Sequence, residues 1–335
     1  MKKEKGLWLD GNTFVSDEEI RRKLANKQTR VEFSKQLKKA RELKDYSSIA
    51  IARSQQAEEL SPRESNHFSL GVAANALINF IGDWHIGHPK TDYHRIEDEV
   101  SIIANTPDSY VALLGDAVDG IHWGGSAQGE DILNLTEQRG FLKSIWRALG
   151  GKILFTVSGE HDSKWASKTG ADPYAEFTEQ TGAPYVRGVA EVDITSGEET
   201  YKVVAAHKAR GHSMYNKTHP GMRQARFGVQ GADIYASGHT HQKGSSQEEI
   251  RDFGGESREV THINVGPYTS GGEFAEREGF PTQTKEQQGG IVARLLKRGE
   301  KKHVEVVTDI AEANTEQITR AGFIRKDLWK GKNDS

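Results

Sequence analysis

The stretch KILFTVSGEHD, residues 152–162, joins an apolar run to three consecutive side chains that can take part in chemistry. Residues 153–157 are mostly β-branched or apolar, which is typical of a strand buried on both faces. Glu160, His161 and Asp162 follow directly after Gly159. In sheets with parallel strands, ligands bind beyond the carboxyl ends of the strands. The stretch therefore predicts a buried strand with a functional site at its end.

Four further apolar runs end in the same way, at a glycine or a histidine followed by polar residues. They are ALINFIG (76–82), YVALLG (110–115), YKVVAAH (201–207) and ADIYASG (232–238). Helical patterns such as EQRGFLKSIWRAL and DPYAEFTEQTG lie between them. Strands that alternate with helices are typical of layered α/β folds, in which helices cover central strands. The sequence therefore predicts an α/β fold, and later runs in VTHINVGPY and in residues 289–310 are expected to form a second sheet.

The residues at these five strand ends are of the types that bind divalent metals. They are Asp83 and His85, Asp116 with Asp119, Glu160 with His161 and Asp162, His207, and His239 with His241. Mixed imidazole and carboxylate ligands suit manganese, iron or zinc better than calcium or magnesium. In a D-x-H pattern both side chains lie on one face of an extended segment, so one ion could use both. A single D-x-H or H-x-H occurs by chance, but five such strand ends together indicate a metal site.

In chain order the motifs are GDWHIG, LLGDAVDG, VSGEHD, VVAAHK and ASGHTHQ, which span about residues 78–242. The order D-x-H, G-D-x-x-D, G-N-H-D or G-N-H-E, a lone His and G-H-x-H resembles that of the calcineurin-like metallophosphoesterases, especially their phage and bacterial branch. The resemblance implies a four-layer α/β/β/α sandwich that hydrolyses phosphomonoesters or phosphodiesters. Two divalent ions about 3.5–4 Å apart would share an activated hydroxide. Mn²⁺ is the expected metal, with iron, zinc or magnesium as alternatives.

The resemblance also assigns roles to single residues. Its ligands would be Asp83, His85 and His241 for the first ion, His207, His239 and Glu160 for the second, and Asp116 as the bridge. His161 resembles the family's histidine that contacts the phosphoryl oxygen and can protonate the leaving group. Asp162 would fix the tautomer of that histidine and raise its basicity.

Glu160 departs from the family pattern, which has Asn at this position. Asn offers a carbonyl to a metal and an NH₂ group to a phosphate oxygen, whereas an ionised Glu offers acceptors alone. A third carboxylate also lowers the net charge of the two ions and their ligands to about +1. Such a site should attract a doubly charged monoester less strongly. We therefore expect a phosphodiester substrate.

Substrate contacts are expected from the cationic stretch HKARGHSMYNKTHPGMRQARFG, residues 207–228, which follows a predicted metal-ligand strand. Cationic side chains in this position can track phosphates, and the alternative is a solvated loop and helix face. The candidate contacts are Arg210, His212, Tyr215, Asn216 and Arg223.

Three classes of function fit these patterns. A nuclease or nucleic-acid phosphodiesterase is favoured by the stretch 207–228 and by a basic N-terminal segment, and its partner would be nucleic acid. A phosphodiesterase or phosphatase that acts on small molecules such as nucleotides would need no such segment. A metal-binding scaffold with reduced catalysis is the third class, although the intact ligand positions and His161 argue against decay.

The first 60 residues carry 14 Lys and Arg against 10 Asp and Glu, whereas the remaining 275 carry 31 against 38. Capping-box patterns at Ser16 and Thr29 predict short helices in this segment. The basic helical extension could dock on the main domain or on another subunit, or it could bind nucleic acid. The expected organisation is a helical extension (1–60), a linker (61–75), the metallophosphoesterase domain (76–310) and a C-terminal helix with a frayed tail (311–335).

The overall composition excludes several other classes. A chain of 335 residues can bury a full core, and its net charge of −3 gives no overall attraction to nucleic acid or to membranes. The absence of cysteine excludes disulfides and thiol catalysis and fits a reducing cytoplasm. No window approaches the roughly 20 apolar residues that span a bilayer. A cytoplasmic protein without a membrane partner is therefore expected.

Overall fold

The computed structural model describes most of residues 66–330 and short parts of the segment before them. The gaps after residue 66 are 121–130, 171, 212, 214, 252–253, 256, 272–278, 280 and 300, and the described residues before it are 6–9, 13–16, 35, 38, 46 and 47. The backbone alone is described for 6–9, 13–16, 175, 176, 179 and 323–330. The chain forms two compact units, Met1–Glu64 and Ser65–Ser335.

The larger unit contains two six-stranded sheets, here called sheet I and sheet II. Sheet I has the strand order β14-β13-β4-β5-β6-β7. Its strands are β4 (Leu77–Ile81), β5 (Ser109–Leu113), β6 (Ile153–Val157), β7 (Tyr185–Val186), β13 (Ile291–Arg298) and β14 (Lys301–Val307). Strands β4 to β7 are parallel, whereas β13 and β14 add antiparallel pairs beside β4.

Sheet II has the strand order β11-β12-β10-β9-β8-β3. Its strands are β3 (His67–Val72), β8 (Val189–Ser196), β9 (Glu199–Ala206), β10 (Ile234–Ser237), β11 (Gly244–Arg251) and β12 (Ser257–Asn264). Strands β9, β10 and β12 are parallel to one another. The carboxyl ends of β9 and β10 therefore lie at one edge of this sheet.

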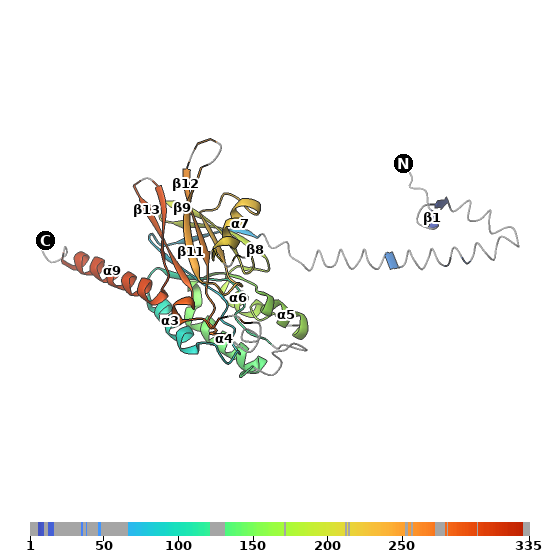
Figure 1. Ribbon diagram of the computed structural model, residues 1–335, viewed down its shortest axis with the longest axis horizontal. Coiled ribbons are helices and arrows are strands. Elements are labelled where there is room, and N and C mark those ends of the chain that lie inside the picture. The colour runs from blue at the N-terminus through green and yellow to red at the C-terminus, as the bar shows by residue number, and fades with distance from the viewer. Residues whose placement is uncertain are drawn as a thin grey trace. The chain divides into compact units, whose positions relative to one another are not determined.

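The described helices of this unit are α3 (Tyr93–Asn105), α4 (Leu135–Leu149), α5 (Glu160–Thr169), α6 (Ala175–Thr181), α7 (His219–Phe227) and α9 (Ile310–Lys330), with short 3₁₀ turns η1 (Gly150–Lys152) and η2 (Lys285–Gln287). Along the chain, helices separate the strands from β4 to β7, and α7 lies between β9 and β10; Figure 1 labels these elements. The two helical patterns singled out in the sequence correspond to α4 and α6.

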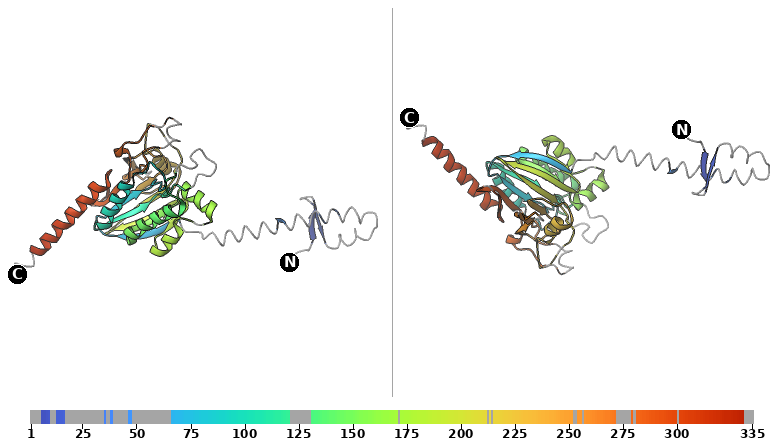
Figure 2. Two further views of the ribbon diagram at one scale, coloured as in Figure 1. Left: turned by 90° about the horizontal axis from the view of Figure 1, so that it is seen from below. Right: turned by 90° about the horizontal axis from the view of Figure 1, so that it is seen from above.

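Alternation along the strands builds the layers. In β4, Ile78 and Phe80 pack between the sheets against residues of β9 such as Val203, whereas Leu77 and Ile81 face the opposite way. That outer face of sheet I is covered by apolar side chains of α3, α4, α6 and α9. The outer face of sheet II packs on α7 through Ala225. Figure 2 shows the stacked sheets with helices outside them. The predicted four-layer α/β/β/α sandwich is confirmed.

Two expectations about strands need correction. The later runs were expected to share one second sheet, but only β12 joins sheet II, while β13 pairs antiparallel with β4 in sheet I. Strand β3 lies within residues 61–75, where a linker was predicted, and pairs with β8. Its side chains alternate between exposed and half-buried positions, so its apolar pattern is weak. Pairing with strands distant in sequence placed β13 in sheet I and made β3 a strand of sheet II. The local residue pattern carries no information about such pairing.

The smaller unit contains an antiparallel pair of strands, β1 (Gly6–Leu9) and β2 (Thr13–Ser16), which the sequence analysis did not predict. Trp8 lies opposite Phe14 in the register, and aromatic residues favour strands. Four later residues of this unit are helical, namely Lys35, Lys38, Tyr46 and Ser47. The rest of the predicted helical segments lies outside the described residues.

A buried polar network ties the C-terminal helix α9 to sheet I. Asn79 donates to the Ser109 hydroxyl at 2.8 Å, and that hydroxyl donates to Asn314 Oδ1 at 2.6 Å. The Asn314 side chain donates back to Asn79 Oδ1 at 3.0 Å, and all three residues are fully buried. Buried polar groups are costly when they lose a partner, so the three side chains stabilise the fold only as a set.

We predict that Asn314→Ala lowers the free energy of unfolding by about 2–3 kcal/mol, because it leaves the buried Asn79 Oδ1 without this donor and the Ser109 hydroxyl without its acceptor. Urea denaturation followed by circular dichroism measures the change. Thr315→Ala is the control, since Thr315 is exposed on the same turn, and it should cost less than about 0.5 kcal/mol. Equal effects of the two substitutions would contradict the network.

Candidate metal centre

Imidazoles and carboxylates from both sheets meet at one edge of the sandwich. Among the described residues, three sets have ligand atoms that all lie within 4.8 Å of one another. Group one is Asp83, His85 and His241, group two is Asp116, His207 and His239, and a third set is His85, Asp116 and His161. Groups one and two have the membership that the resemblance implied for two ions, apart from Glu160. The third set links them, because it shares His85 with one and Asp116 with the other.

These ligands stand on backbone in the left-handed region. Of the seven described non-glycine residues with a positive φ, five are candidate ligands: Asp83 (53°), His85 (47°), Asp116 (50°), His239 (68°) and His241 (53°). Side chains rarely adopt this conformation, which typically costs about 1–3 kcal/mol per residue. Each strand therefore ends in a sharp turn that aims a side chain into the common edge. Backbone strain of this kind clusters at functional sites, where the direction of a side chain is kept at a cost in the stability of the fold.

Two residues of group one, Asp83 and His85, are each positioned by a hydrogen bond to a residue outside the group. Asp83 is fully buried, and its carboxylate oxygens accept hydrogen bonds from the His239 backbone N–H at 3.0 and 3.2 Å. His85 Nδ1 lies 2.8 Å from Asp119 Oδ1, and its Nε2 lies 3.2 Å from His241 Nε2. Because a carboxylate accepts, a neutral His85 carries its proton on Nδ1 and presents the Nε2 lone pair to His241. Two imidazole nitrogens that face each other in this way can share one cation.

Group two has the same construction. Asp116 Oδ1 accepts from the His161 backbone N–H at 2.8 Å, and its Oδ2 lies 3.0 Å from His207 Nε2. His207 Nδ1 donates to the Leu114 carbonyl at 2.7 Å, so a neutral ring has its lone pair on Nε2. Within the described part of the chain, that buried Nε2 pairs with Asp116 when the ring is protonated, and it makes no other hydrogen bond. A cation between the imidazole and the carboxylate would satisfy both.

Glycine is required where a second segment approaches these carboxylates. A Cβ at Gly159 would lie 2.0 Å from Asp116 Oδ1, and one at Gly238 would lie 2.7 Å from Asp83 Oδ2. Both distances are far below any normal contact. The glycines of GEHD and GHTH therefore allow the backbone N–H groups to reach the buried oxygens.

The role expected of Asp162 is corrected by its contacts. Asp162 Oδ2 accepts from the N–H groups of Gly159 and Asp116, each at 2.8 Å, and its Oδ1 has no hydrogen-bond partner among the described residues. His161 Nδ1 instead lies 2.7 Å from the backbone carbonyl of Asp119. Asp162 is the third residue of α5, where an acidic side chain folds back over the start of the helix. It fixes the turn before α5, whereas Asp119 orients His161.

Asp119 is therefore a site residue to which the resemblance assigned no role, although it was among the metal-binding residue types at the strand ends. Its side chain meets His85 and its carbonyl meets His161, so one residue positions rings in two of the sets. Partners of this kind fix the tautomer of a metal-ligating histidine. The signal was present in the sequence as the second aspartate of LLGDAVDG.

The protonation of the rings follows their neighbours. Burial opposes the charged form of His85 and of His207, yet the Asp119 carboxylate raises the pKa of His85 to about 9 and the Asp116 carboxylate raises the pKa of His207 to about 10. Burial and the charge on His85 lower the pKa of His161 to about 4. Without an ion, protons on His85 and His207 thus balance the buried carboxylates. A divalent cation could replace those protons in the same role.

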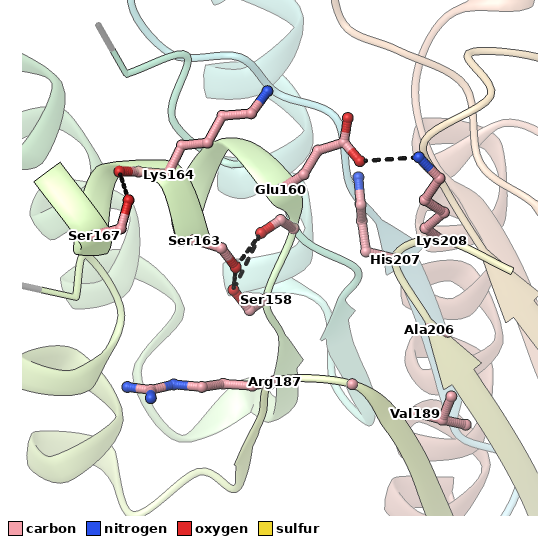
Figure 3. A pocket seen from close by; sticks show the side chains of 12 residues that line it. Ser158, Glu160, Ser163, Lys164, Ser167, Arg187, Val189, Ala206, His207 and Lys208 are labelled. Atoms are coloured by element: carbon pink, nitrogen blue, oxygen red, sulfur yellow. Dashed lines mark hydrogen bonds and ion pairs between the residues drawn. The ribbon is translucent and has the colours of Figure 1, made fainter. Parts of the chain in front are cut away.

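Glu160 does not belong to any of the three sets. Its Oε2 lies 3.4 Å from His239 Nδ1 and 3.3 Å from Lys208 Nζ, and its side chain is 37% exposed. Figure 3 shows Lys208 joined to Glu160 above His207. Lys208 offsets the charge of Glu160, so the pair adds no net charge beside the centre. The expected preference for diesters therefore cannot rest on Glu160 alone.

The predicted substrate contacts lie in the loop and helix that follow β9. Arg210 and Arg223 are exposed, and Tyr215 is 93% exposed. Asn216 is half-buried, and its Oδ1 accepts from the Thr218 backbone N–H at 3.0 Å and hydroxyl at 2.9 Å, so it shapes the loop. His212 lies outside the described residues.

The side chains present fit divalent metal ions. Ligand atoms about 2.1 Å from one ion can be up to about 4.2 Å apart, so group one and group two could each close on an ion with small side-chain movements. The Nε2 of His207, which faces Asp116, and the facing Nε2 atoms of His85 and His241 offer the lone pairs that such an ion needs. Imidazole and carboxylate ligands together suit manganese, iron or zinc.

Comparisons with known proteins give a likeness of structure and none of sequence. No family model and no curated protein matches the chain. Similar solved structures include vacuolar protein sorting 29 from Cryptosporidium parvum, with 17% identity over 69% of this chain and 96% of that one and a TM-score of 0.33. A metallophosphoesterase from Sphaerobacter thermophilus shares 16% identity over 73% of this chain and 94% of that one, with a TM-score of 0.33.

A third similar structure is the phosphopantetheinyl hydrolase of Mycobacterium tuberculosis, with 10% identity over 59% of this chain and 92% of that one and a TM-score of 0.29. Likenesses at these TM-scores support no inference about activity. Among the helices that the structure describes, none combines the length and apolar character needed to cross a membrane.

We predict that Asp116→Ala removes bound metal from both groups, because Asp116 belongs to group two and shares the third set with His85 of group one. The manganese content after dialysis against manganese should fall from about two ions per chain in the wild type to well below one in Asp116→Ala. Inductively coupled plasma mass spectrometry measures this content. Asp172→Ala is the control, since Asp172 pairs with Arg187 and lies in none of the sets. Retention of two ions in Asp116→Ala would contradict the shared arrangement.

Proposed function

We propose that the protein is a metal-dependent phosphoesterase that cleaves phosphodiester bonds, with nucleic acid as its substrate. The observation that carries the proposal is the pair of ligand groups joined through His85, Asp116 and His161. Ions bound there would supply Lewis-acid activation of a water and neutralisation of phosphate charge, and manganese is the ion we propose. The order of the sequence motifs, which resembles that of the calcineurin-like metallophosphoesterases, supports the same reaction class.

In this proposal the residues of the chain position the reactants. The His161 backbone N–H holds Asp116 Oδ1, so the other oxygen, Oδ2, stays directed at His207. His161 has one ring nitrogen fixed on the Asp119 carbonyl, which leaves the other for a phosphoryl oxygen or a leaving group. A bound phosphate would favour a proton on that nitrogen, since opposite charge nearby stabilises the charged form of a ring. His161 would then act on the leaving group as a general acid.

The surface beside group two supports nucleic acid as the substrate. The segment that follows His207 carries exposed cations, and Tyr215 is almost fully exposed among them. Cations contact phosphates, while an exposed aromatic ring can stack on a base. The exposed cations are Lys208, Arg210, Lys217, Arg223 and Arg226. The arrangement favours a polynucleotide over a small molecule.

A second candidate is hydrolysis of nucleotides or other small diesters. It is favoured by a pocket of about 500 Å³ beside His207 and Glu160, which is within the usual range of small-molecule sites. A panel of single-stranded DNA, duplex DNA, RNA, cyclic nucleotides and a chromogenic diester, each with manganese and with chelator, separates the two candidates. Metal binding without turnover of any of these would favour a scaffold.

We predict that His161→Ala lowers the rate for a chromogenic phosphodiester by about 10²–10⁴-fold while metal content stays near wild type, because His161 is assigned to proton transfer. Steady-state kinetics at saturating manganese and elemental analysis of the same preparation measure the two effects. If metal is lost in proportion to rate, His161 is a ligand and its proposed role is wrong.

We predict that Arg223→Ala weakens binding to a single-stranded oligonucleotide and lowers the slope of log affinity against log salt by about one, because one phosphate contact is lost. Hydrolysis of the small chromogenic diester should be unchanged. The matched control is Arg298→Ala, since Arg298 is exposed at the end of β13, which runs antiparallel to β4 and so ends at the opposite edge. An equal loss in both variants would mean that the segment after His207 does not contact the strand.

A further inference from the structure

A pocket beside group two is not explained by the metal ligands. It has a volume of about 500 Å³ and is bordered by His207 and Glu160, so it opens directly onto the candidate centre. Its walls come from three places in the chain: the start of α5, the turn between β7 and β8, and the end of β9. Figure 3 shows α5 on one side of this space and β9 on the other. A phosphodiester held at group two would have one of its two ester-linked groups next to this pocket.

One wall of the pocket is apolar and carries little side-chain bulk. It is formed by Val189, Ala206 and Gly188. Val189 is half-buried and Ala206 is buried, so the wall belongs to the packed edge of sheet II and is fixed in place. An apolar wall of this kind can pack against the face of a sugar or a base. It offers nothing specific to an isolated phosphate.

The rim of the same pocket is cationic. Lys164, Arg187 and Lys208 border it, and Glu160 is the one acidic residue among the described residues of its lining. Lys208 is engaged by Glu160 at 3.3 Å, and Arg187 is engaged by Asp172 at 3.2 Å. Lys164 makes no ion pair within the described residues, and Figure 3 shows its amine extended above the start of α5. It is therefore the cation that remains available for an anion of the substrate.

The hydroxyl groups in the lining do not compete with Lys164 for that anion. Ser163 donates to the Gly159 carbonyl at 2.8 Å, and Ser167 donates to the Lys164 carbonyl at 2.8 Å. Their lone pairs remain, but their protons are used within the protein. Anionic oxygens accept hydrogen bonds, so the pocket recognises them through ammonium groups rather than through these hydroxyls.

We propose that this pocket binds the nucleotide unit next to the scissile phosphate, with the nucleoside against Val189 and Ala206 and its far phosphate paired with Lys164. The inference rests on the proposed function and narrows its substrate. The preferred substrate is one that carries a second phosphate one nucleotide away from the bond that is cut. A polynucleotide meets this condition, and so does a dinucleotide with a terminal phosphate.

The test compares three thymidine dinucleotides with the full chain loaded with manganese: TpT, pTpT and TpTp. At least one of the two with a terminal phosphate should have a KM about tenfold below that of TpT at similar kcat, the effect expected of one charge-assisted hydrogen bond. Lys164→Ala should bring the KM ratio close to one and leave TpT unchanged. The control is Lys168→Ala, since Lys168 is exposed on the same helix and does not border the pocket.

Equilibrium binding without catalysis distinguishes this inference from the proposed function. The same dinucleotides are titrated into wild type and Lys164→Ala in the presence of chelator. Tighter binding of a phosphorylated dinucleotide that disappears in Lys164→Ala would support the pocket even if nothing is hydrolysed. Hydrolysis in which the terminal phosphate makes no difference, or an equal loss in Lys164→Ala and Lys168→Ala, would overturn the pocket while the proposed function stood. Neither hydrolysis nor binding would overturn both.

Discussion

Asp116 lies buried at the end of β5, with one carboxylate oxygen fixed by the His161 N–H and the other facing His207 at 3.0 Å. The rest of the candidate centre depends on this constraint. The carboxylate can stay in the interior only if positive charge is nearby, and the charged form of His207 or a metal ion provides it. Group one reaches the same residue through His85, so both groups have to be built around it.

The sandwich supplies the geometry for that constraint. Asp116 comes from sheet I and His207 from sheet II, and the apolar layer between the sheets holds their strand ends at one edge. The left-handed backbone at five ligands is unfavourable locally, at about 1–3 kcal/mol each. Packing of the strands before and after these turns has to offset that cost. Rigid sheets thus give the imidazoles and carboxylates directions that short turns alone would not keep.

Charge changes across a short distance from the centre to the surface. In the buried centre, imidazoles balance the carboxylates. The Asp119 carboxylate and the Leu114 carbonyl hold a proton on Nδ1 of His85 and of His207, respectively. At the rim, Glu160 is balanced by Lys208. Also at the rim, Lys164 makes no ion pair within the described residues, and Arg210 and Arg223 are exposed in the segment after His207. A substrate with several phosphates in a row fits this change of charge better than a substrate with a single charge. The same kind of substrate therefore fits both the proposed reaction and the proposed pocket.

Residue type and spacing along the chain predicted much of the site. Apolar runs that stop at glycine or histidine predicted the strands, because a buried strand needs a continuous apolar pattern and its end must be polar. The residues at those ends predicted the members of groups one and two, together with Glu160, which belongs to neither group. The sandwich was also correct as an expectation from the motif order. None of this required knowledge of which strands are neighbours.

Tertiary structure decided what depends on neighbours distant in sequence. It placed β13 beside β4, brought β3 into sheet II, and gave the positioning of His161 to Asp119 in place of Asp162. It also turned Glu160 toward Lys208, which no local pattern specifies. The sequence by itself determined which residues stand at the strand ends, since local apolar pattern and residue chemistry are written along the chain. Only the folded chain decided which oxygen and which nitrogen face each other, because hydrogen bonds and ion pairs form between atoms that only packing brings together.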